Sequence, residues 1–317
     1  MTYLTKYGSL WGDVPQTHGQ VFWVSPTASY VVDGRSYDAG DGNDGLSPEK
    51  ALRTINRAIV LATASVGDVI MLLPSATAHT DSVTVTLNKA GLTFVGCQPG
   101  FRAHHNFRNN AITSKVNWTS TFAGVGITNT AADCTFVGIN FIPVTAQTMM
   151  TCIATPRNTW IDCALTMSAS ASTSTKGFVF SGAAGAYCSF TNCTFMNTIG
   201  AQGPAIDCTA AVNFLVDKCT FVVTTGSWAI AVQGGAALTG IFRDNDWQCI
   251  GTAMTKGFSG TGVAAAKALL FTRNYFGVSP GAAGITDMGT TSFCELDNNY
   301  VATIGGGTGG TLNTTIS

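Results

Sequence analysis

The chain contains little charge. Charged residues make up 10% of its 317 residues, the formal net charge is −1, and the only glutamates are Glu49 and Glu295. So weak a field draws a protein neither to nucleic acid nor to an anionic membrane surface, so neither is expected as a partner. No apolar run reaches the roughly 18 residues of a transmembrane helix, so no such helix is expected.

The marks of a secreted, disulfide-bonded protein are also missing. The opening segment MTYLTKYGSLWGD has no basic region followed by an apolar core, so we expect no secretory signal. None of the ten cysteines forms a CxxC pair, and several recur inside strand-like segments. We therefore expect reduced, mostly buried thiols in a chain made in a reducing compartment.

What the chain does have is an internal repeat. Seven segments share one pattern: TFVGINF (135–141), TWIDCAL (159–165), SFTNCTF (189–195), LVDKCTF (215–221), IFRDNDW (241–247), LFTRNYF (270–276) and ELDNNYV (295–301). The central residue of each segment, taken as its reference, recurs at a nearly regular interval, at Ile139, Cys163, Cys193, Cys219, Asn245, Asn274 and Asn299. The earlier TFVGC (93–97) fits at Cys97, and the longer interval from there to Ile139 indicates an irregular or unmatched coil in between.

Two apolar columns accompany the reference. Three positions before it stand Phe94, Phe136, Trp160, Phe190, Val216, Phe242, Phe271 and Leu296. Two positions after it stand Phe141, Leu165, Phe195, Phe221, Trp247, Phe276 and Val301. The two positions just before the reference are mostly polar. Because side chains alternate along a strand, this pattern describes two short strands that meet at a bend, with both columns pointing inward.

A period of about 25 residues with short strands is typical of a solenoid of stacked parallel strands. Leucine-rich repeats share the period but need a leucine consensus, which is absent. The columns resemble the right-handed, single-stranded parallel β-helix of pectin-lyase-like proteins, an all-β fold. That resemblance implies aromatic stacks inside and a hydrogen-bonded asparagine ladder at a bend, which Asn245, Asn274 and Asn299 match. The change from cysteine to asparagine along the reference column predicts a ladder that begins apolar and ends polar.

The stretch DAGDGNDGLSPEKALRTINRAI (38–59) precedes the repeat. Ser47 as N-cap and Pro48 in the first turn predict a helix over 48–63, followed by a first buried strand in GDVIMLLP (67–74). No register of Asp38 or Asp41 gives the ligand spacing of an EF-hand, so we interpret the acidic run as a structural turn rather than a metal site. The passage resembles the N-terminal cap of many parallel β-helix proteins.

These features divide the chain. We predict an N-terminal arm over 1–30, an acidic turn and capping helix over 31–66, the β-helix over 67–301, and a Gly/Thr-rich tail over 302–317. The arm is too aromatic for a disordered tail, and its aromatic residues include Tyr7, Trp11, Phe22 and Trp23. Two alternatives stay open: the arm docks on a partner, or it packs as an extra strand along its own solenoid.

Chemistry is scarce in the sequence. It contains no P-loop, GxSxG or HExxH motif. Its best charged cluster consists of Asp217, Asp244, Asp246 and Asp297, with Lys218, Arg243 and Arg273 between them. Alternating charges on stacked strands neutralise one another on any solvated face, so we interpret the cluster as a solvated ladder. We therefore expect no catalytic residue, no cofactor, no metal and no enzymatic activity.

Residues 5–75 resemble the start of β-helix proteins of tailed-bacteriophage virions. The resemblance implies a virion structural protein, assembled in the host cytoplasm. We expect a capsid decoration (cement) protein that binds the major capsid protein or another virion protein. The alternative is a tail fibre or tailspike component that binds or cleaves host surface polysaccharide. Because charge is depleted in interface cores, the charge-poor lateral faces predict self-association, and phage analogy favours a homotrimer.

Overall fold

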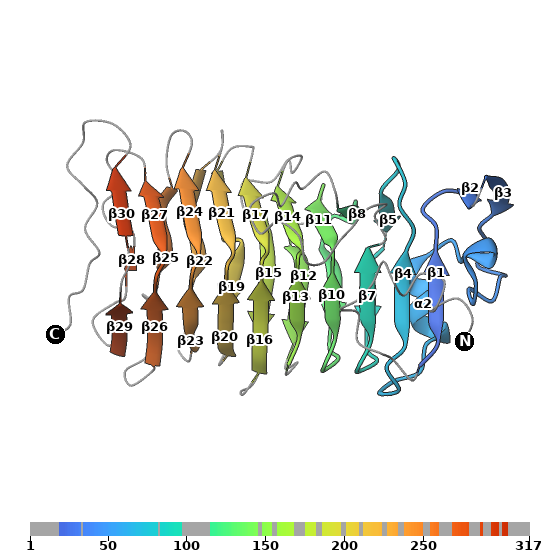
Figure 1. The fold of residues 1–317 in the computed structure, drawn as a ribbon, viewed down its shortest axis with the longest axis horizontal. Coiled ribbons are helices and arrows are strands. Elements are labelled where there is room, and N and C mark those ends of the chain that lie inside the picture. Colours follow the sequence, from blue (N-terminus) through green and yellow to red (C-terminus); the bar gives the residue numbers. More distant parts are fainter. Residues whose placement is uncertain are drawn as a thin grey trace.

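The structure of the protein is a computed structural model. It describes residues 19–32, 34–81, 83–96, 115–144, 148–153, 157–167, 175–181, 186–197, 201–208, 212–223, 227–233, 238–249, 254–259, 268–278, 286–287, 293–297 and 300–303. Within these ranges the chain forms an elongated solenoid of three parallel β-sheets, with the N-terminal segment at one end and the last strands at the other (Figure 1). The all-β parallel β-helix expected from the repeat is confirmed.

The first sheet lies before the bend of each coil. Its ten strands, in spatial order, are β1 (Val21–Val24), β4 (Val69–Leu72), β7 (Thr93–Gly96), β10 (Thr135–Val137), β13 (Thr159–Ile161), β16 (Ala186–Thr191), β20 (Val212–Asp217), β23 (Leu238–Arg243), β26 (Ala268–Thr272) and β29 (Phe293–Asp297).

The second sheet follows the bend. Its nine strands are β5 (His79–Asp81), β8 (Val116–Ser120), β11 (Ile139–Pro143), β14 (Ala164–Met167), β17 (Thr194–Asn197), β21 (Thr220–Val223), β24 (Asp246–Cys249), β27 (Tyr275–Val278) and β30 (Tyr300–Thr303).

The third sheet closes each coil. Its main path contains β6 (Val85–Leu87), β9 (Val125–Asn129), β12 (Thr148–Ile153), β15 (Lys176–Ser181), β19 (Ile206–Cys208), β22 (Ser227–Gln233), β25 (Met254–Ser259) and β28 (Thr286–Asp287), while β18 (Ala201–Gln202) also pairs with β22. Outside the solenoid, β2 (Ser29–Val32) and β3 (Arg35–Asp38) form an antiparallel hairpin.

The predicted aromatic columns are stacks in the core. Phe136 lies in register between Phe94 and Trp160, with ring centroids 5.1 and 5.4 Å away. On the second sheet, Phe221 stacks against Phe195 at 4.6 Å and against Trp247 at 5.0 Å. All of these rings are buried. The strand spacing of about 4.8 Å places identical positions of successive coils in contact, so a ring at one position stacks on the ring of the next coil. Val216 interrupts the first column and Leu165 the second, and the side chains of Phe276, Leu296 and Val301 lie outside what the structure describes.

The bend between the first two sheets uses left-handed backbone. The residue before the reference has a positive φ of 51 to 55° at Asp162, Asn192, Lys218, Asp244 and Arg273, and Gly138 takes the same place with φ 65°. This backbone conformation is unfavourable for residues other than glycine. Its repetition at successive coils indicates that the neighbouring bends hold it in place.

The reference column forms the predicted ladder. The Cys163 thiol donates to the carbonyl of Phe136 at 3.3 Å, on the coil before it. In later coils, Asn274 donates its amide to the carbonyl of Phe242 at 2.9 Å and accepts from Asn245 at 3.0 Å. Cysteine and asparagine therefore satisfy the same backbone groups, the thiol weakly and the amide strongly. The predicted change from an apolar to a polar ladder is confirmed as far as Asn274, and Asn299 lies outside the described residues.

The irregular or unmatched coil expected between Cys97 and Ile139 is not present as an additional coil. β7 pairs directly with β10, and Val116 of β8 lies opposite the reference residue Ile139. No additional coil therefore separates Phe94 from Phe136. The longer interval arises because β7 ends at Gly96 and β8 begins only at Val116, and Cys97 itself lies outside the described residues.

The single helix predicted over 48–63 is wrong in extent. A 3-10 turn η1 (Pro48–Lys50) and a shorter helix α2 (Ile55–Leu61) flank an extended stretch. In that stretch Leu52 exchanges backbone hydrogen bonds with β1, donating to Trp23 and accepting from Ser25. Pairing with β1 overrides helix propensity in this stretch. Helix α2 therefore begins after it, with Thr54 as its N-cap, and the Thr54 hydroxyl accepts the backbone N–H of Arg57 at 3.2 Å.

Helix α2 packs against β1, β4 and β6 near the N-terminal end of the solenoid (Figure 1). Its buried residues Ile55, Ala58 and Ile59 join the same core cluster as Phe22 and Val85. The strand predicted in 67–74 is β4, but it is second in its sheet because β1 precedes it. The segment predicted as an arm over 1–30 thus contains a strand of the solenoid.

The acidic turn is held by its own carboxylates. Asp41 accepts the backbone N–H groups of Arg53 and Thr54 at 3.0 and 2.9 Å, and the Thr54 hydroxyl at 2.9 Å. Asn43 donates to the carbonyl of Ala51 at 2.9 Å. These contacts fix the entry of the chain into α2, which is the structural use expected for this run.

Candidate functional site

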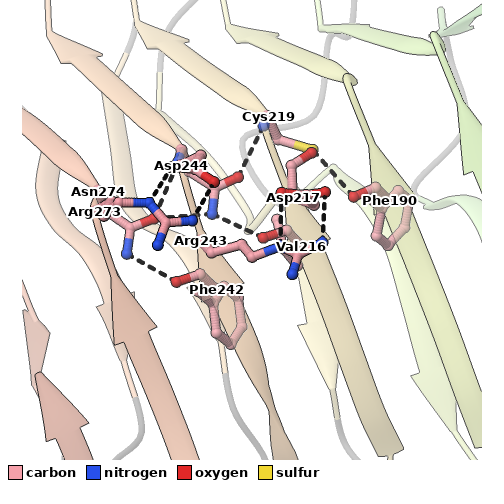
Figure 2. A network of polar contacts seen from close by, with 10 residues as sticks. Phe190, Val216, Asp217, Cys219, Phe242, Arg243, Asp244, Arg273 and Asn274 are labelled. Carbon is pink, nitrogen blue, oxygen red and sulfur yellow. Dashed lines mark hydrogen bonds and ion pairs between the residues drawn. The ribbon is translucent and has the colours of Figure 1, made fainter. Parts of the chain in front are cut away.

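The charged residues of the bend form bidentate ion pairs between coils (Figure 2). Arg243 contacts Asp217 through Nε–Oδ1 at 2.9 Å and Nη2–Oδ2 at 3.1 Å. Arg273 contacts Asp244 through Nε–Oδ1 and Nη2–Oδ2, each at 2.8 Å. The hydrogen bonds from Arg273 hold the pKa of Asp244 below its usual value. These carboxylates are occupied in structural pairs, as the predicted ladder requires, although Asp217 is buried rather than solvated.

The same bend is polar at earlier coils. Asn192 donates its side-chain amide to the Asp162 carboxylate, and Lys115 donates Nζ to the backbone carbonyl of Asp162. Lys115 and Asp162 are both buried, and burial raises the pKa of Asp162, although Lys115 acts against this rise. The seven-residue cluster expected from the sequence is not one site, because Asp246 lies beyond the bend on β24. The side chain of Asp297 lies outside what the structure describes.

A separate ion pair, not noticed in the sequence, lies on the outer face of the third sheet. Val179 of β15 is in register with Asp207 of β19, while the neighbouring Phe178 and Ile206 point into the core. Lys176 Nζ lies 2.6 Å from Asp207 Oδ2. The lysine side chain is 40% exposed and the aspartate side chain only 5%. The carboxylate is therefore shielded beneath an accessible ammonium group.

Gly177 brings the two strands close enough for this pair. Its N–H donates to the carbonyl of Pro204 at 3.1 Å, and a Cβ at this position would lie 2.3 Å from the carbonyl oxygen of Ala205. The N–H of Gly203 in turn donates to the carbonyl of Thr175 at 3.0 Å. The segment before β19 is thus bonded along the start of β15, which places Asp207 next to Lys176. The sequence signal is a single charge in the apolar run AIDC (205–208), within reach of a strand that begins with lysine.

A third group lies on the outer face of the second sheet. Asp246 is in register with Thr220 on one side and Tyr275 on the other. Its Oδ2 accepts the side-chain amide of Gln248, while its buried Oδ1 has no partner among the residues that the structure describes. Burial raises the pKa of Asp246, and the hydrogen bond from Gln248 acts against this rise.

Of the aromatic residues predicted to dock on a partner, two are buried in the solenoid and two lie outside the described residues. Phe22 and Trp23 are buried on β1, which pairs with β4 of the same solenoid. They are not available to a partner, and for these two residues the docking prediction is corrected in favour of the extra-strand alternative. Tyr7 and Trp11 lie outside the described residues.

The described ranges contain neither a metal-ligand cluster nor a membrane-spanning helix. No three His, Cys, Asp or Glu side chains in them are grouped as ligands for a metal ion. No helix in the same part of the chain has the length and hydropathy needed to cross a membrane.

Comparison with known proteins identifies the architecture. No protein-family model and no curated protein matches the chain. Among solved structures, deglycosylated pectin methylesterase from Aspergillus niger aligns over 91% of this chain and 86% of its own, with 11% identity and a TM-score of 0.53. A penultimately deglycosylated form of that enzyme aligns over 92% and 87%, with 12% identity and the same TM-score of 0.53. Pectin methylesterase from carrot aligns over 90% and 84%, with 11% identity and a TM-score of 0.45.

The expectation that this chain is not an enzyme is corrected by the comparison. The Aspergillus niger proteins that share its fold along about nine-tenths of its length are enzymes. The expectation rested on the absence of known catalytic motifs and on the reading of the best charged cluster as a neutralised ladder, but hydrolysis requires only one or two well-placed carboxylates outside that cluster. At these identities the likeness establishes a shared fold, that of pectin methylesterase-like parallel β-helices.

Proposed function

We propose that the protein binds an extended polysaccharide along the outer face of the third sheet and hydrolyses an ester group on it. The observation that carries this proposal is the Lys176–Asp207 pair, with its 2.6 Å contact and its unequal exposure. Asp207 takes a proton from the attacking water as the water oxygen bonds to the ester carbon. It returns that proton to the departing alkoxide when the ester C–O bond breaks, which releases an alcohol and leaves a carboxylate on the polymer. The Lys176 ammonium group faces the carbonyl oxygen on which negative charge develops.

The spacing of carboxylates favours ester hydrolysis over glycoside hydrolysis. Glycosidases need two carboxyl groups about 5 to 9.5 Å apart. The strands of the third sheet contain two acidic residues, Asp207 and Asp287. Asp287 occupies the same register row as Asp207, three strands farther on. Three steps of about 4.8 Å separate the two backbones by about 14 Å, too far for that pair.

The shared fold supports the substrate class. The Aspergillus niger neighbours are pectin methylesterases, whose name states that they act on methyl esters of pectin. A flat solenoid face suits an extended chain, since each coil offers one outward position about 4.8 Å from the next. A lysine at the centre of that face also suits a polymer that carries some free carboxylates.

Release of methanol from methyl-esterified pectin tests the proposal. The wild-type protein should release methanol, and Asp207→Asn and Lys176→Met should each lower the rate by at least about a hundredfold. Asp133→Asn provides a matched control, because Asp133 also forms an ion pair, with Arg157 at 2.5 Å, but on exposed loops. Wild-type protein that releases no methanol would refute the assignment.

A place in a virion is a further proposal, and it rests on the likeness of residues 5–75 to phage β-helix proteins. A tail fibre or tailspike component agrees with action on a host polysaccharide. The capsid decoration role, with a homotrimer bound to the major capsid protein, stays a prediction. Light scattering on the purified protein tests the trimer, whose mass should be near three times 32.9 kDa.

A further inference from the structure

We infer that Asp246, Gln248 and Tyr275 form a non-catalytic sugar-binding subsite on the outer face of the second sheet. The inference rests on the proposed action on a polysaccharide but concerns a different face of the solenoid. Asp246 and Tyr275 occupy one outward row of adjacent strands, and Gln248 is the next outward residue of β24. The three side chains thus belong to one small area across two coils.

The first argument is an unmet hydrogen bond. Asp246 Oδ1 is buried and has no partner in the described part of the chain, whereas Oδ2 accepts from Gln248. A buried acceptor without a partner is unfavourable. The residue as a whole remains partly exposed, so a rotation of its side chain can bring Oδ1 to the surface, where the hydroxyl group of a ligand donates to it. Neighbouring hydroxyls of a sugar ring can contact the carboxylate and the adjacent amide together.

The second argument is the aromatic surface beside this carboxylate. Tyr275 is 42% exposed, unlike the stacked rings of the core. The strand position opposite Gln248 is Gly277, which has no side chain to occupy the space next to that amide. An exposed ring beside hydrogen-bonding groups suits a sugar, because one face of a pyranose is apolar and its edge carries hydroxyls.

The charges nearby favour a neutral part of the ligand. Arg273, two residues before Tyr275, forms a bidentate pair with Asp244 at 2.8 Å. Arg243, three residues before Asp246, forms one with Asp217. Asp246 is itself acidic, so a carboxylate-bearing sugar would be repelled when Asp246 is ionised. The subsite therefore fits an esterified or neutral sugar unit, whereas Lys176 on the third sheet suits free carboxylates.

Retardation of the native protein in gels that contain methyl-esterified pectin tests the subsite. Tyr275→Ala and Asp246→Asn should each weaken the apparent affinity by about tenfold or more. Tyr275→Phe keeps the ring and should remain within about threefold of wild type. The matched control is Tyr187→Ala, which removes another exposed tyrosine, 65% accessible, whose neighbour in register is Asn213 rather than a carboxylate. Wild-type retardation of Tyr275→Ala, or equal loss in Tyr187→Ala, would overturn the inference.

The two proposals can fail separately. If retardation depends on Tyr275 while no methanol is released, the subsite stands and the hydrolytic proposal fails. The opposite result is a Tyr275→Ala variant that releases methanol from short esterified oligomers at the wild-type rate and is retarded in the gel as strongly as the wild type. In that case the subsite fails and the hydrolytic proposal stands. Circular dichroism of each variant confirms that the solenoid is folded.

Discussion

The side-chain oxygen of Asn245 accepts the backbone N–H of Cys219, on the preceding coil, at 2.8 Å. The amide nitrogen of the same asparagine donates to the carbonyl of Val216 at 2.9 Å. Left-handed bend residues interrupt the regular pairing of the strands here, so these backbone groups depend on the side chain. The ladder therefore links adjacent coils at the point where their sheets change direction.

Asn245→Ala should lower the free energy of unfolding by about 3 kcal/mol, because two buried backbone groups lose their partners. Asn245→Cys is the matched variant, since cysteine occupies this position in three earlier coils. It should cost less than half as much. Urea unfolding followed by circular dichroism measures both. Equal loss in the two variants would show that the ladder hydrogen bonds do not contribute.

The stacked rings of the core should matter far more than the bend charges. Phe195→Ala or Phe221→Ala should cost about 3–5 kcal/mol, because each removes a buried ring from a stack. Arg273→Ala should cost less than about 1 kcal/mol, since that side chain is largely exposed. Unfolding midpoints compare the two classes of variant. Similar shifts in both would contradict the inward position of the rings.

The buried thiols should be unreactive in the folded protein. Burial raises the pKa of Cys188 to about 12 and of Cys134 to about 11, and it raises the pKa of Cys193 well above its usual value. Only the thiolate attacks a disulfide reagent. Titration of native protein should therefore detect few thiols, and titration after denaturation without reductant should detect close to ten. A full set of disulfides in fresh protein would contradict this prediction.

Two inward residues of β5 should give opposite pH dependences. Burial lowers the pKa of His79 to about 4. Burial raises the pKa of Asp81 to about 6, although a 2.6 Å hydrogen bond from Trp118 acts to lower it. The stability that neutral His79 contributes is present above pH 6.5 and is lost as the pH falls towards 4. The stability that protonated Asp81 contributes is present below pH 3.8 and is lost as the pH rises through 6.

Between pH 4 and 6 these two contributions offset each other. Unfolding free energies of single variants, measured across that range, separate them. In Asp81→Asn, stability should fall more steeply than in wild type as the pH is lowered, because only the histidine contribution remains. In His79→Gln, stability should rise relative to wild type as the pH is lowered over the same interval. Parallel curves for all three proteins would show that neither group titrates with a shifted pKa.

The sequence by itself determined which side chains point inward. Phe136, Trp160 and Phe190 recur at one position of each repeat, and strand alternation fixes their side of the sheet whatever lies between them. The same logic predicted the change from Cys219 to Asn245 in the ladder. These features depend on local geometry and on contact with the next coil, and both are repeated in the sequence.

Only the tertiary structure decided which outward groups meet and where the repeat is interrupted. Lys176 and Asp207 are far apart in the sequence, and their contact depends on the close approach at Gly177. The helix expected over 48–63 is broken because Leu52 pairs with β1. The long interval before Ile139 reflects the length of chain between β7 and β8 rather than an unmatched coil, since β7 pairs directly with β10. The interval between successive reference residues varies along the chain because the loops differ in length. Loop length decides which outward side chains come into contact, and no local sequence pattern encodes the path of a loop.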